Sequence, residues 1–282
     1  MVFRILALGD VVGKPGRQAV CELLPGLVRE REVHFVVCNG ENVAGGSGIT
    51  ANLFHKLRSY GVDVVTLGDH TYKRAEIAET LSGSERIIRP ANFSKASPGK
   101  GLVVVECSRE PFAGLRVAVG QVIGRIFVNL PAGDPFEAAD AELARVPESV
   151  KIRVFDAHCE ATSEKLAVGH WLDGRVGLVF GTHTHTPTAD AKILPGGTAF
   201  ISDVGMCGPY DSILGRRKDS VLKHMTTLMP FPFDVATGDT KLCGVLAEID
   251  PNTGRASHIE RVELPLAKVD GAYDADDRPS RK

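Results

Sequence analysis

Several apolar segments of the 282-residue chain end in a glycine or alanine, and a side chain that can bind metal follows at once. Ligands of α/β proteins bind just beyond the carboxyl ends of the strands. We therefore expect these side chains to converge on one site. The candidate ligands are Asp10, Glu41, Asn42, Asp69, His158, His183 and His185.

The donor types indicate which chemistry this site could perform. Carboxylates, an amide oxygen and neutral imidazoles form a mixed oxygen and nitrogen set that suits manganese, iron, zinc or nickel. Seven candidate ligands exceed the need of one ion and suit two neighbouring ions that share a carboxylate. Such a pair can hold both the attacking and the leaving oxygen of a phosphoryl group. The sequence therefore predicts a two-metal site for phosphoryl transfer.

The segment Thr182-His183-Thr184-His185 is the sharpest single signal. In an extended segment alternate side chains point the same way, so both rings would share one face. By contrast, Asp10 or the triplet Gly68-Asp69-His70, taken alone, could be no more than a capped turn. The occurrence of all these motifs in one chain is what favours a metal site.

The elements that must position these residues alternate between apolar strands and helices, as in layered α/β proteins. Two further pairs of strands look like hairpins. Periodicity alone establishes only an α/β fold. Strands are expected over 3–8, 34–38, 62–67, 152–157 and 176–180, hairpins over 102–122 and 242–264, and two short strands within 189–204. Helices are expected over 17–30, 51–60 and 134–144, and the first of them should be kinked or broken at Pro25.

Bulk composition excludes several classes of protein. The net charge of −2 gives no basis for nucleic-acid binding through phosphate neutralisation. The N-terminal apolar stretch is too short for a signal peptide, and no apolar run is long enough to cross a membrane, so we expect a cytoplasmic protein. The six cysteines include no CxxC pair and are expected to be reduced structural thiols. One domain is expected over 1–268, followed by a disordered polar tail over 269–282.

The motifs resemble those of the calcineurin-like metallophosphoesterase superfamily, in which Asp-x-His, Gly-Asp, Gly-Asn-His, a lone His and Gly-His-x-His follow in order. This chain departs from that pattern, because no His lies two residues after Asp10 and because Glu41 replaces Asp. Both departures are typical of one branch, the YmdB-like bacterial phosphodiesterases. The shared blocks cover nearly the whole chain: GDxxGxxGR, NGENxAGGxG, RPANF, DxHAExTSEK (DAHCEATSEK here), GTHTHTPTAD and ISDVGMCGP.

The resemblance implies a fold, a cofactor and a mechanism. The fold would be a four-layer α/β/β/α sandwich with two packed mixed sheets, and the cofactor two divalent or trivalent transition-metal ions, iron or manganese ahead of zinc. One ion would be held by Asp10, Asn42 and His185, and a second ion by Asp69, His158 and His183. The carboxylate of Glu41 would bind both ions and so bridge them. A metal-held hydroxide would attack a small phosphodiester, such as a 2′,3′-cyclic nucleotide, with His70 as general acid.

Three residues depart from the usual pattern of the branch. Asp69 stands where an Asn is usual, so an amide ligand becomes a carboxylate and the site gains negative charge. Lys73 stands where an acidic residue is usual, which changes the local charge beside the site. Cys159 replaces an Ala, a change that we attribute to packing.

Other functions stay open at this point. A metal-dependent phosphomonoesterase or another hydrolase could use the same donors, although amidohydrolases carry an early His-x-His that is absent here. A nucleotide-binding regulator with weak activity is a further alternative, against which the intact ligand set argues. A homo-oligomer is also compatible with the sequence, for example through the hairpin within 102–122.

Overall fold

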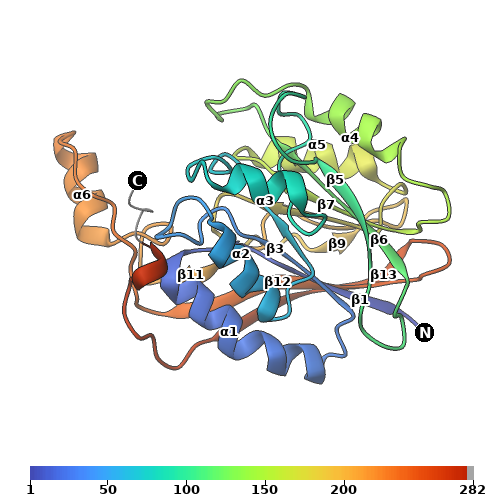
Figure 1. Ribbon diagram of the computed structural model, residues 1–282, viewed down its shortest axis with the longest axis horizontal. Helices are drawn as coiled ribbons and strands as arrows, with labels where there is room; N and C mark the ends of the chain where they lie inside the picture. Colours follow the sequence, from blue (N-terminus) through green and yellow to red (C-terminus); the bar gives the residue numbers. More distant parts are fainter. Residues whose placement is uncertain (278–282) are drawn as a thin grey trace.

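The computed structural model describes residues 1–277, and two β-sheets organise the chain (Figure 1). The first sheet has seven strands in the order β2-β11-β12-β1-β3-β4, and β13 pairs with β12. Because β1, β3 and β4 are parallel neighbours, their carboxyl ends lie at one edge. The strands are β1 (Phe3–Leu8), β2 (Asp10–Val11), β3 (Phe35–Asn39), β4 (Val64–Thr66), β11 (Met206–Pro209), β12 (Thr240–Ile249) and β13 (Ala256–Pro265).

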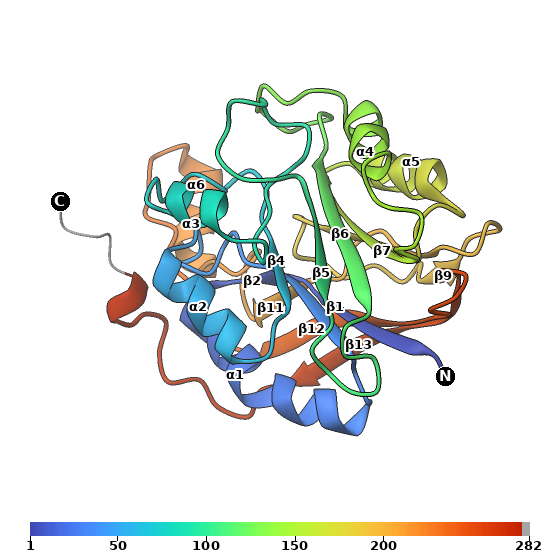
Figure 2. The ribbon, with the colours of Figure 1, turned by 45° about the vertical axis from the view of Figure 1, so that its right-hand side comes forward.

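The second sheet has six strands in the order β5-β6-β7-β8-β10-β9. The pairs β6–β7, β7–β8 and β8–β10 are parallel, whereas β5–β6 and β9–β10 are antiparallel. Figure 2 shows β5 and β6 side by side as the predicted hairpin. The strands are β5 (Leu102–Glu106), β6 (Arg116–Ile123), β7 (Ile152–His158), β8 (Leu178–Thr182), β9 (Lys192–Ile193) and β10 (Ala199–Ile201).

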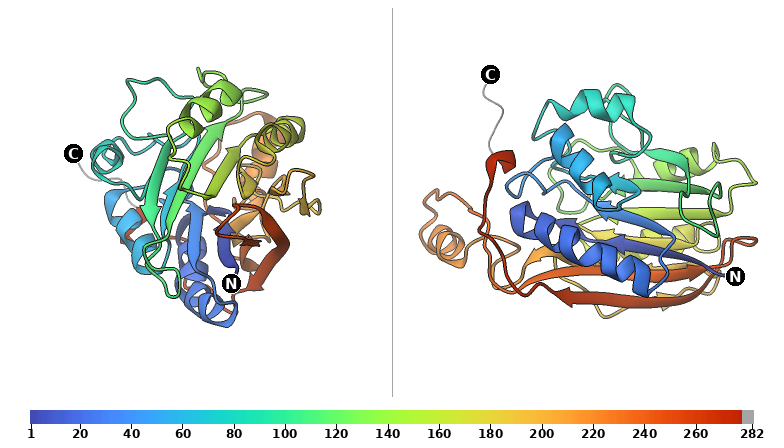
Figure 3. Two further views of the ribbon diagram at one scale, coloured as in Figure 1. Left: turned by 90° about the vertical axis from the view of Figure 1, so that its right-hand side faces the viewer. Right: turned by 60° about the horizontal axis from the view of Figure 1, so that its bottom comes forward.

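Three apolar layers hold the sheets and helices together. Phe3, Phe35 and Phe180 belong to the cluster between the two sheets. Helices α1 and α2 cover the outer face of the first sheet, and α4 and α5 cover that of the second (Figure 3). This arrangement confirms the predicted four-layer α/β/β/α sandwich. The helices are α1 (Gly13–Glu30), α2 (Ala51–Ser59), α3 (Ile77–Gly83), α4 (Pro135–Leu143), α5 (Thr162–Leu172) and α6 (Lys218–Thr227).

The helices differ in places from the expectations. Helix α1 continues through Pro25 without a break and starts earlier than predicted. Helix α5 was not predicted, because Glu164, Lys165 and Gly169 interrupt the apolar pattern of its buried face. Helices α3 and α6 were also missed: α3 has only seven residues, and α6 buries only Val221 and projects from the domain, so it has no apolar stripe facing a core.

The C-terminal segment packs on the domain up to the last described residue. Arg17, nearly fully buried, pairs with Asp274 and Asp277, and Asp277 also accepts a hydrogen bond from the backbone N–H of Gly45. These contacts differ from the disordered tail expected over 269–282, of which residues 278–282 lie outside the described part. Within residues 1–277, no helix is long and apolar enough to cross a membrane.

Candidate metal centre

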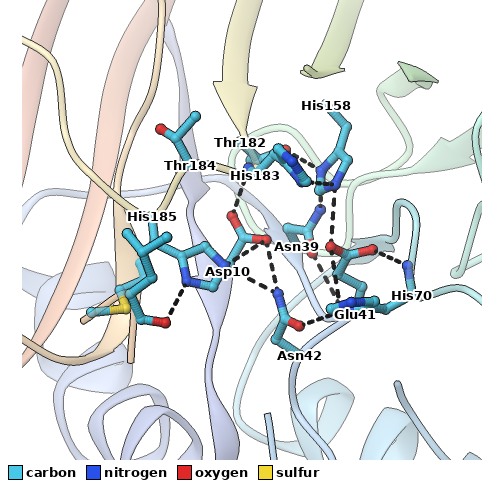
Figure 4. A network of polar contacts seen from close by, with 12 residues as sticks. Asp10, Asn39, Glu41, Asn42, His70, His158, Thr182, His183, Thr184 and His185 are labelled. Atoms are coloured by element: carbon cyan, nitrogen blue, oxygen red, sulfur yellow. Dashed lines mark hydrogen bonds and ion pairs between the residues drawn. The ribbon is translucent and has the colours of Figure 1, made fainter. Parts of the chain in front are cut away.

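The ends of five strands from both sheets meet at one place (Figure 4). The first sheet brings Asp10 at the start of β2, Glu41 and Asn42 after β3, and Asp69 after β4. The second sheet brings His158 as the last residue of β7, and His183 and His185 after β8. All seven predicted ligands therefore lie in one region between the two sheets.

Four of these side chains form a compact set, which we call the four-residue group: Glu41, Asp69, His158 and His183. One ligand atom from each lies within 4.8 Å of the others. Nε2 of His158 is 3.1 Å from a carboxylate oxygen of Glu41 and 3.1 Å from Oδ1 of Asp69, and Nδ1 of His183 is 3.2 Å from the same Asp69 oxygen. Donors bound at about 2.0–2.2 Å to one ion lie about 2.8–3.1 Å apart when adjacent in an octahedral site and about 3.3–3.6 Å apart in a tetrahedral site. The spacing of this group therefore fits a transition-metal ion.

The ring nitrogens that face away from this group have partners of their own. Nδ1 of His158 lies 2.8 Å from the hydroxyl of Thr182 and 3.3 Å from the amide of Asn39. Nε2 of His183 lies 3.0 Å from a carboxylate oxygen of Glu160. Such outer contacts fix which nitrogen of a metal-binding histidine is free to bind metal.

Behind His158 lies the buried carboxylate of Asp156. It accepts hydrogen bonds from the hydroxyls of Thr66 and Thr182, each at 2.6 Å, and from the amide of Gln121 at 2.9 Å. Burial raises the pKa of Asp156 to about 6, while His158 and the hydroxyl donors limit that rise. This network spans both sheets and fixes the orientation of Thr182, which in turn contacts His158.

The other three predicted ligands, which we call the three-residue group, are Asp10, Asn42 and His185. Nε2 of His185 is 3.5 Å from Oδ1 of Asp10, and the amide nitrogen of Asn42 is 3.3 Å from the same oxygen and 3.1 Å from Nε2 of His185. Nδ1 of His185 lies 3.1 Å from the carbonyl oxygen of Leu214. In this orientation the oxygen of Asn42 faces away from His185, so Asn42 could bind an ion here only after its amide turns over.

Gly68 allows the close approach of the two sheets, and Gly181 allows the close approach of β8 to the segment that follows β10 within the second sheet. A Cβ on Gly68 would lie 2.2 Å from Nε2 of His158 and 2.5 Å from a Glu41 oxygen. A Cβ on Gly181 would lie 1.7 Å from the carbonyl oxygen of Ser202. A side chain at Gly68 would therefore fill the space between the donors of the four-residue group.

The two late histidines do not lie on one extended segment, as the alternation had predicted. Strand β8 ends at Thr182, and both His183 (φ 92°) and His185 (φ 61°) are left-handed. The two rings consequently reach different groups. Non-glycine residues adopt this conformation at a cost of about 1–3 kcal/mol, which surrounding contacts must offset.

Thr184, between the two histidines, is one source of such contacts. Its hydroxyl and its backbone N–H both donate to the carboxylate of Asp203, at 2.7 and 3.2 Å. The same buried carboxylate pairs with Lys165 at 2.5 Å. This ion pair therefore secures the loop that carries His183 and His185.

The charges of the site are complementary in the absence of an ion. Burial opposes ionisation of Asp10, yet the neighbouring His185 and His158 lower its pKa below the ordinary value. Burial likewise opposes ionisation of Asp69, but hydrogen bonds from His158 and His183 lower the pKa of Asp69. Burial disfavours protonation of His158 and His185, but nearby carboxylates raise the pKa of both. The ionised carboxylates of Asp10 and Asp69 therefore favour positive charge at the place where metal ions would bind.

His70 lies beside both groups and is not a member of the four-residue group. Its backbone N–H donates to Glu41 at 2.8 Å, and Nδ1 lies 2.7 Å from the amide oxygen of Asn42. Nε2 lies 3.5 Å from Asp69, and the side chain is 28% exposed. A group so placed can contact a substrate that approaches the two donor groups.

The predicted residues of the site are therefore brought together, but their supports were not predicted. Asn39 and Glu160 stand inside the motifs that carry the predicted ligands. Their closeness in sequence to Glu41 and His158 was the signal that could have identified them as supports. Asp156 also stands in such a motif, two residues before His158, whereas Gln121 and the carbonyl of Leu214 carry no such signal, because tertiary packing alone brings them to the site. Cys159 is buried in an apolar cluster, as expected from packing.

Comparisons with known proteins agree on one family. A model of the YmdB-like protein family matches residues 6–262. The 2′,3′-cyclic-nucleotide 2′-phosphodiesterase of Bacillus subtilis is 45% identical over 259 residues, 92% of this chain and 96% of that protein. A hypothetical protein of Thermus thermophilus superposes with a TM-score of 0.85 at 39% identity, covering 93% of this chain and 99% of the other. A novel phosphatase of Mycoplasma pneumoniae gives a TM-score of 0.86 at 30% identity, covering 94% of each chain. The chain belongs to the YmdB-like protein family.

Proposed function

We propose that the protein is a phosphodiesterase that uses two transition-metal ions. The observation that carries this proposal is the pairing of the four-residue group with the three-residue group at one junction of the two sheets. Two adjacent donor sets suit a reaction in which one oxygen attacks phosphorus and another leaves.

The ligands divide between two ions in this proposal. Asp69, His158 and His183 would hold one ion, Asp10 and His185 the other, and Glu41 would bridge them. Asn42 would complete the second site once its amide oxygen faces the ion. When bound, the ions supply positive charge to the phosphoryl oxygens and lower the pKa of bound water.

Asn42 would also couple this site to His70. Turning the amide directs its N–H₂ group to Nδ1 of His70, which lies 2.7 Å from the present oxygen. Nδ1 then accepts a hydrogen bond, so the proton of a neutral imidazole resides on Nε2, from which it can donate a hydrogen bond to the leaving oxygen. Full proton transfer as general acid requires the imidazolium, whose Nδ1–H would instead donate to the amide oxygen of Asn42, as in the present orientation.

The substrate that we propose is a 2′,3′-cyclic nucleotide, because the Bacillus subtilis relative is named for that substrate. Water would add across the bond between phosphorus and O2′: its oxygen would bind phosphorus, O2′ would take a proton from protonated His70, and the proton that the water loses would restore His70. The product would be a nucleoside 3′-phosphate. Iron or manganese is proposed ahead of zinc.

The test begins with protein stripped by a chelator and reloaded with Mn²⁺ or Fe²⁺. Elemental analysis should find about two ions per chain, and the reloaded protein should convert 2′,3′-cyclic AMP to 3′-AMP. Stripped protein should be inactive. At most one ion after reloading would contradict the two-metal site, and hydrolysis of neither 2′,3′-cyclic AMP nor bis(p-nitrophenyl) phosphate would contradict the phosphodiesterase.

A phosphomonoesterase is the second candidate, since the Mycoplasma pneumoniae relative is described as a phosphatase. The same reloaded protein should be offered 3′-AMP and p-nitrophenyl phosphate. Faster release of inorganic phosphate than of 3′-AMP from the cyclic nucleotide would favour this alternative.

A further inference from the structure

A cavity of about 340 Å³ opens beside the four-residue group. Asp69 belongs both to its lining and to the group. The other lining residues include Tyr72, Phe93, Leu130 and Pro131, so the walls are largely apolar. An apolar hollow with a possible metal ligand at its edge can bind a molecule that carries an apolar part next to a phosphate.

Two aromatic rings form one side of this cavity. The ring centroids of Tyr72 and Phe93 are 6.2 Å apart, with an angle of 35° between the ring planes. The hydroxyl of Tyr72 donates to the carbonyl of Pro98 at 2.6 Å, which fixes its ring. Aromatic side chains that line a hollow next to a phosphoryl site are suited to stacking with a nucleobase.

The walls are held in place by hydrogen bonds outside the cavity. The buried guanidinium of Arg89 donates to the carbonyls of Pro90, Ser94 and Ser97 and so shapes the loop that carries Phe93. The amide of Asn92 donates to the carbonyls of residues 123 and 133, at 2.7 and 3.0 Å. It thereby ties this loop to the 124–133 segment that carries Leu130 (Figure 2). The cavity is therefore formed before any ligand binds.

We propose that this cavity binds the nucleobase of the substrate, with Phe93 and Tyr72 as its stacking surface. The inference rests on the proposed function. In a 2′,3′-cyclic nucleotide the base is attached to C1′, next to the carbon that carries O2′. The base must consequently lie close beside the phosphoryl group, and the cavity lies directly beside the four-residue group across Asp69.

The kinetic test compares two cyclic phosphodiesters, 2′,3′-cyclic AMP and glycerol 1,2-cyclic phosphate, which has no base. Phe93→Ala should lower kcat/KM for the nucleotide about tenfold or more, as expected for the loss of one stacking contact. It should change kcat/KM for the glycerol ester less than about twofold. Phe127→Ala is the matched control, because Phe127 is 86% exposed and lies outside the cavity lining. An equal loss on both substrates would overturn the inference.

A second variant and a binding measurement keep the test independent of folding and of turnover. Ser94 is exposed at the rim, so Ser94→Phe should fill the cavity without disturbing the core. Saturation-transfer NMR on metal-free wild-type protein should show contact with the base protons of adenosine, and this signal should be lost in Ser94→Phe. No signal with the wild-type protein, or an unchanged signal in the variant, would overturn the base site. Adenosine binding without any phosphodiester turnover would instead refute the proposed function and leave the cavity assignment standing.

Discussion

The two ligand groups at the junction of the sheets differ in how they are held. In the four-residue group, both imidazoles have outer partners, Thr182 and Glu160, and the donors already have the spacing that an ion requires. In the three-residue group, Nδ1 of His185 has one partner, the carbonyl oxygen of Leu214. The amide of Asn42 directs its nitrogen toward His185, although an ion there would need the amide oxygen. The first group is therefore arranged for an ion, whereas the second must reorganise to bind one. We expect the ion of the three-residue group to be the weaker and more exchangeable of the two.

Replacing the shared carboxylate should have the largest effect, because it removes the connection between the groups. Glu41→Gln should lower occupancy at both sites and reduce turnover by more than about 10⁴-fold, since the charges that stabilise the transition state depend on both ions. Elemental analysis and 2′,3′-cyclic AMP hydrolysis check this. Glu85→Gln, at an exposed carboxylate paired with Lys100, is the control. A Glu41→Gln protein with two ions and near-normal rates would show that Glu41 is no bridge.

His70 should matter for chemistry and not for metal content, because it contacts both groups without belonging to the four-residue group. His70→Gln should keep two ions and lose about 10²–10⁴-fold in kcat, the usual worth of a positioned acid. The loss should shrink for bis(p-nitrophenyl) phosphate, whose leaving group needs little protonation. His258→Gln, an exposed histidine on β13, is the matched control. Loss of metal in His70→Gln would make His70 a ligand.

The two late histidines test the comparison directly. His185→Ala should release one ion of two and leave the tighter one, whereas His183→Ala should weaken the tighter site. We expect a loss of about 10²-fold in turnover for His185→Ala, partly restored by excess Mn²⁺ because the weaker site can be filled by mass action. Equilibrium dialysis of both variants against the same Mn²⁺ series would reveal the order of affinity. Equal losses of affinity in the two variants would remove the distinction between the groups.

Metal-free and metal-loaded protein should respond oppositely to pH. In the metal-free protein the pKa values of His158 and His185 are raised, so this stabilisation is complete below the ordinary value of 6.5 and is lost as pH rises through the raised values. The pKa values of Asp10 and Asp69 are lowered, so their contribution is present above about 3.8 and is lost at more acidic pH. Metal-free protein should therefore lose thermal stability from about pH 6.5 upward, while loaded protein gains it as protons stop competing with metal. Melting curves between pH 5 and 9 that shift in parallel would contradict this.

The smallest effect is expected from Asp69→Asn, which restores the residue usual in the family. The amide keeps an oxygen donor but removes one negative charge from the four-residue group. We expect turnover to change by less than about tenfold and affinity for the tighter ion to fall modestly, because one oxygen still faces His158 and His183. Complete loss of that ion, measured by elemental analysis, would show that the carboxylate charge is required here.

The sequence by itself determined the strand-end motifs and thereby the candidate ligands. An apolar strand that ends in glycine and a polar donor is a local pattern, so Asp10, Glu41 and Asp69 could be identified without knowing how the sheets pack. The resemblance of the motif blocks added the four-layer fold, which periodicity could not. Helices α5 and α6 escaped prediction because one carries polar residues on its buried face and the other packs on little of the domain.

Only the tertiary structure decided how the candidate ligands divide into two groups and what supports them. The left-handed conformations of His183 and His185 send neighbouring rings to different groups, and they depend on Thr184 binding to Asp203, which is distant in sequence. The cavity beside Asp69 is likewise assembled from the loop carrying Phe93 and the segment carrying Leu130. Such features depend on contacts between distant segments, whose energies are set by packing and not by the local order of residues.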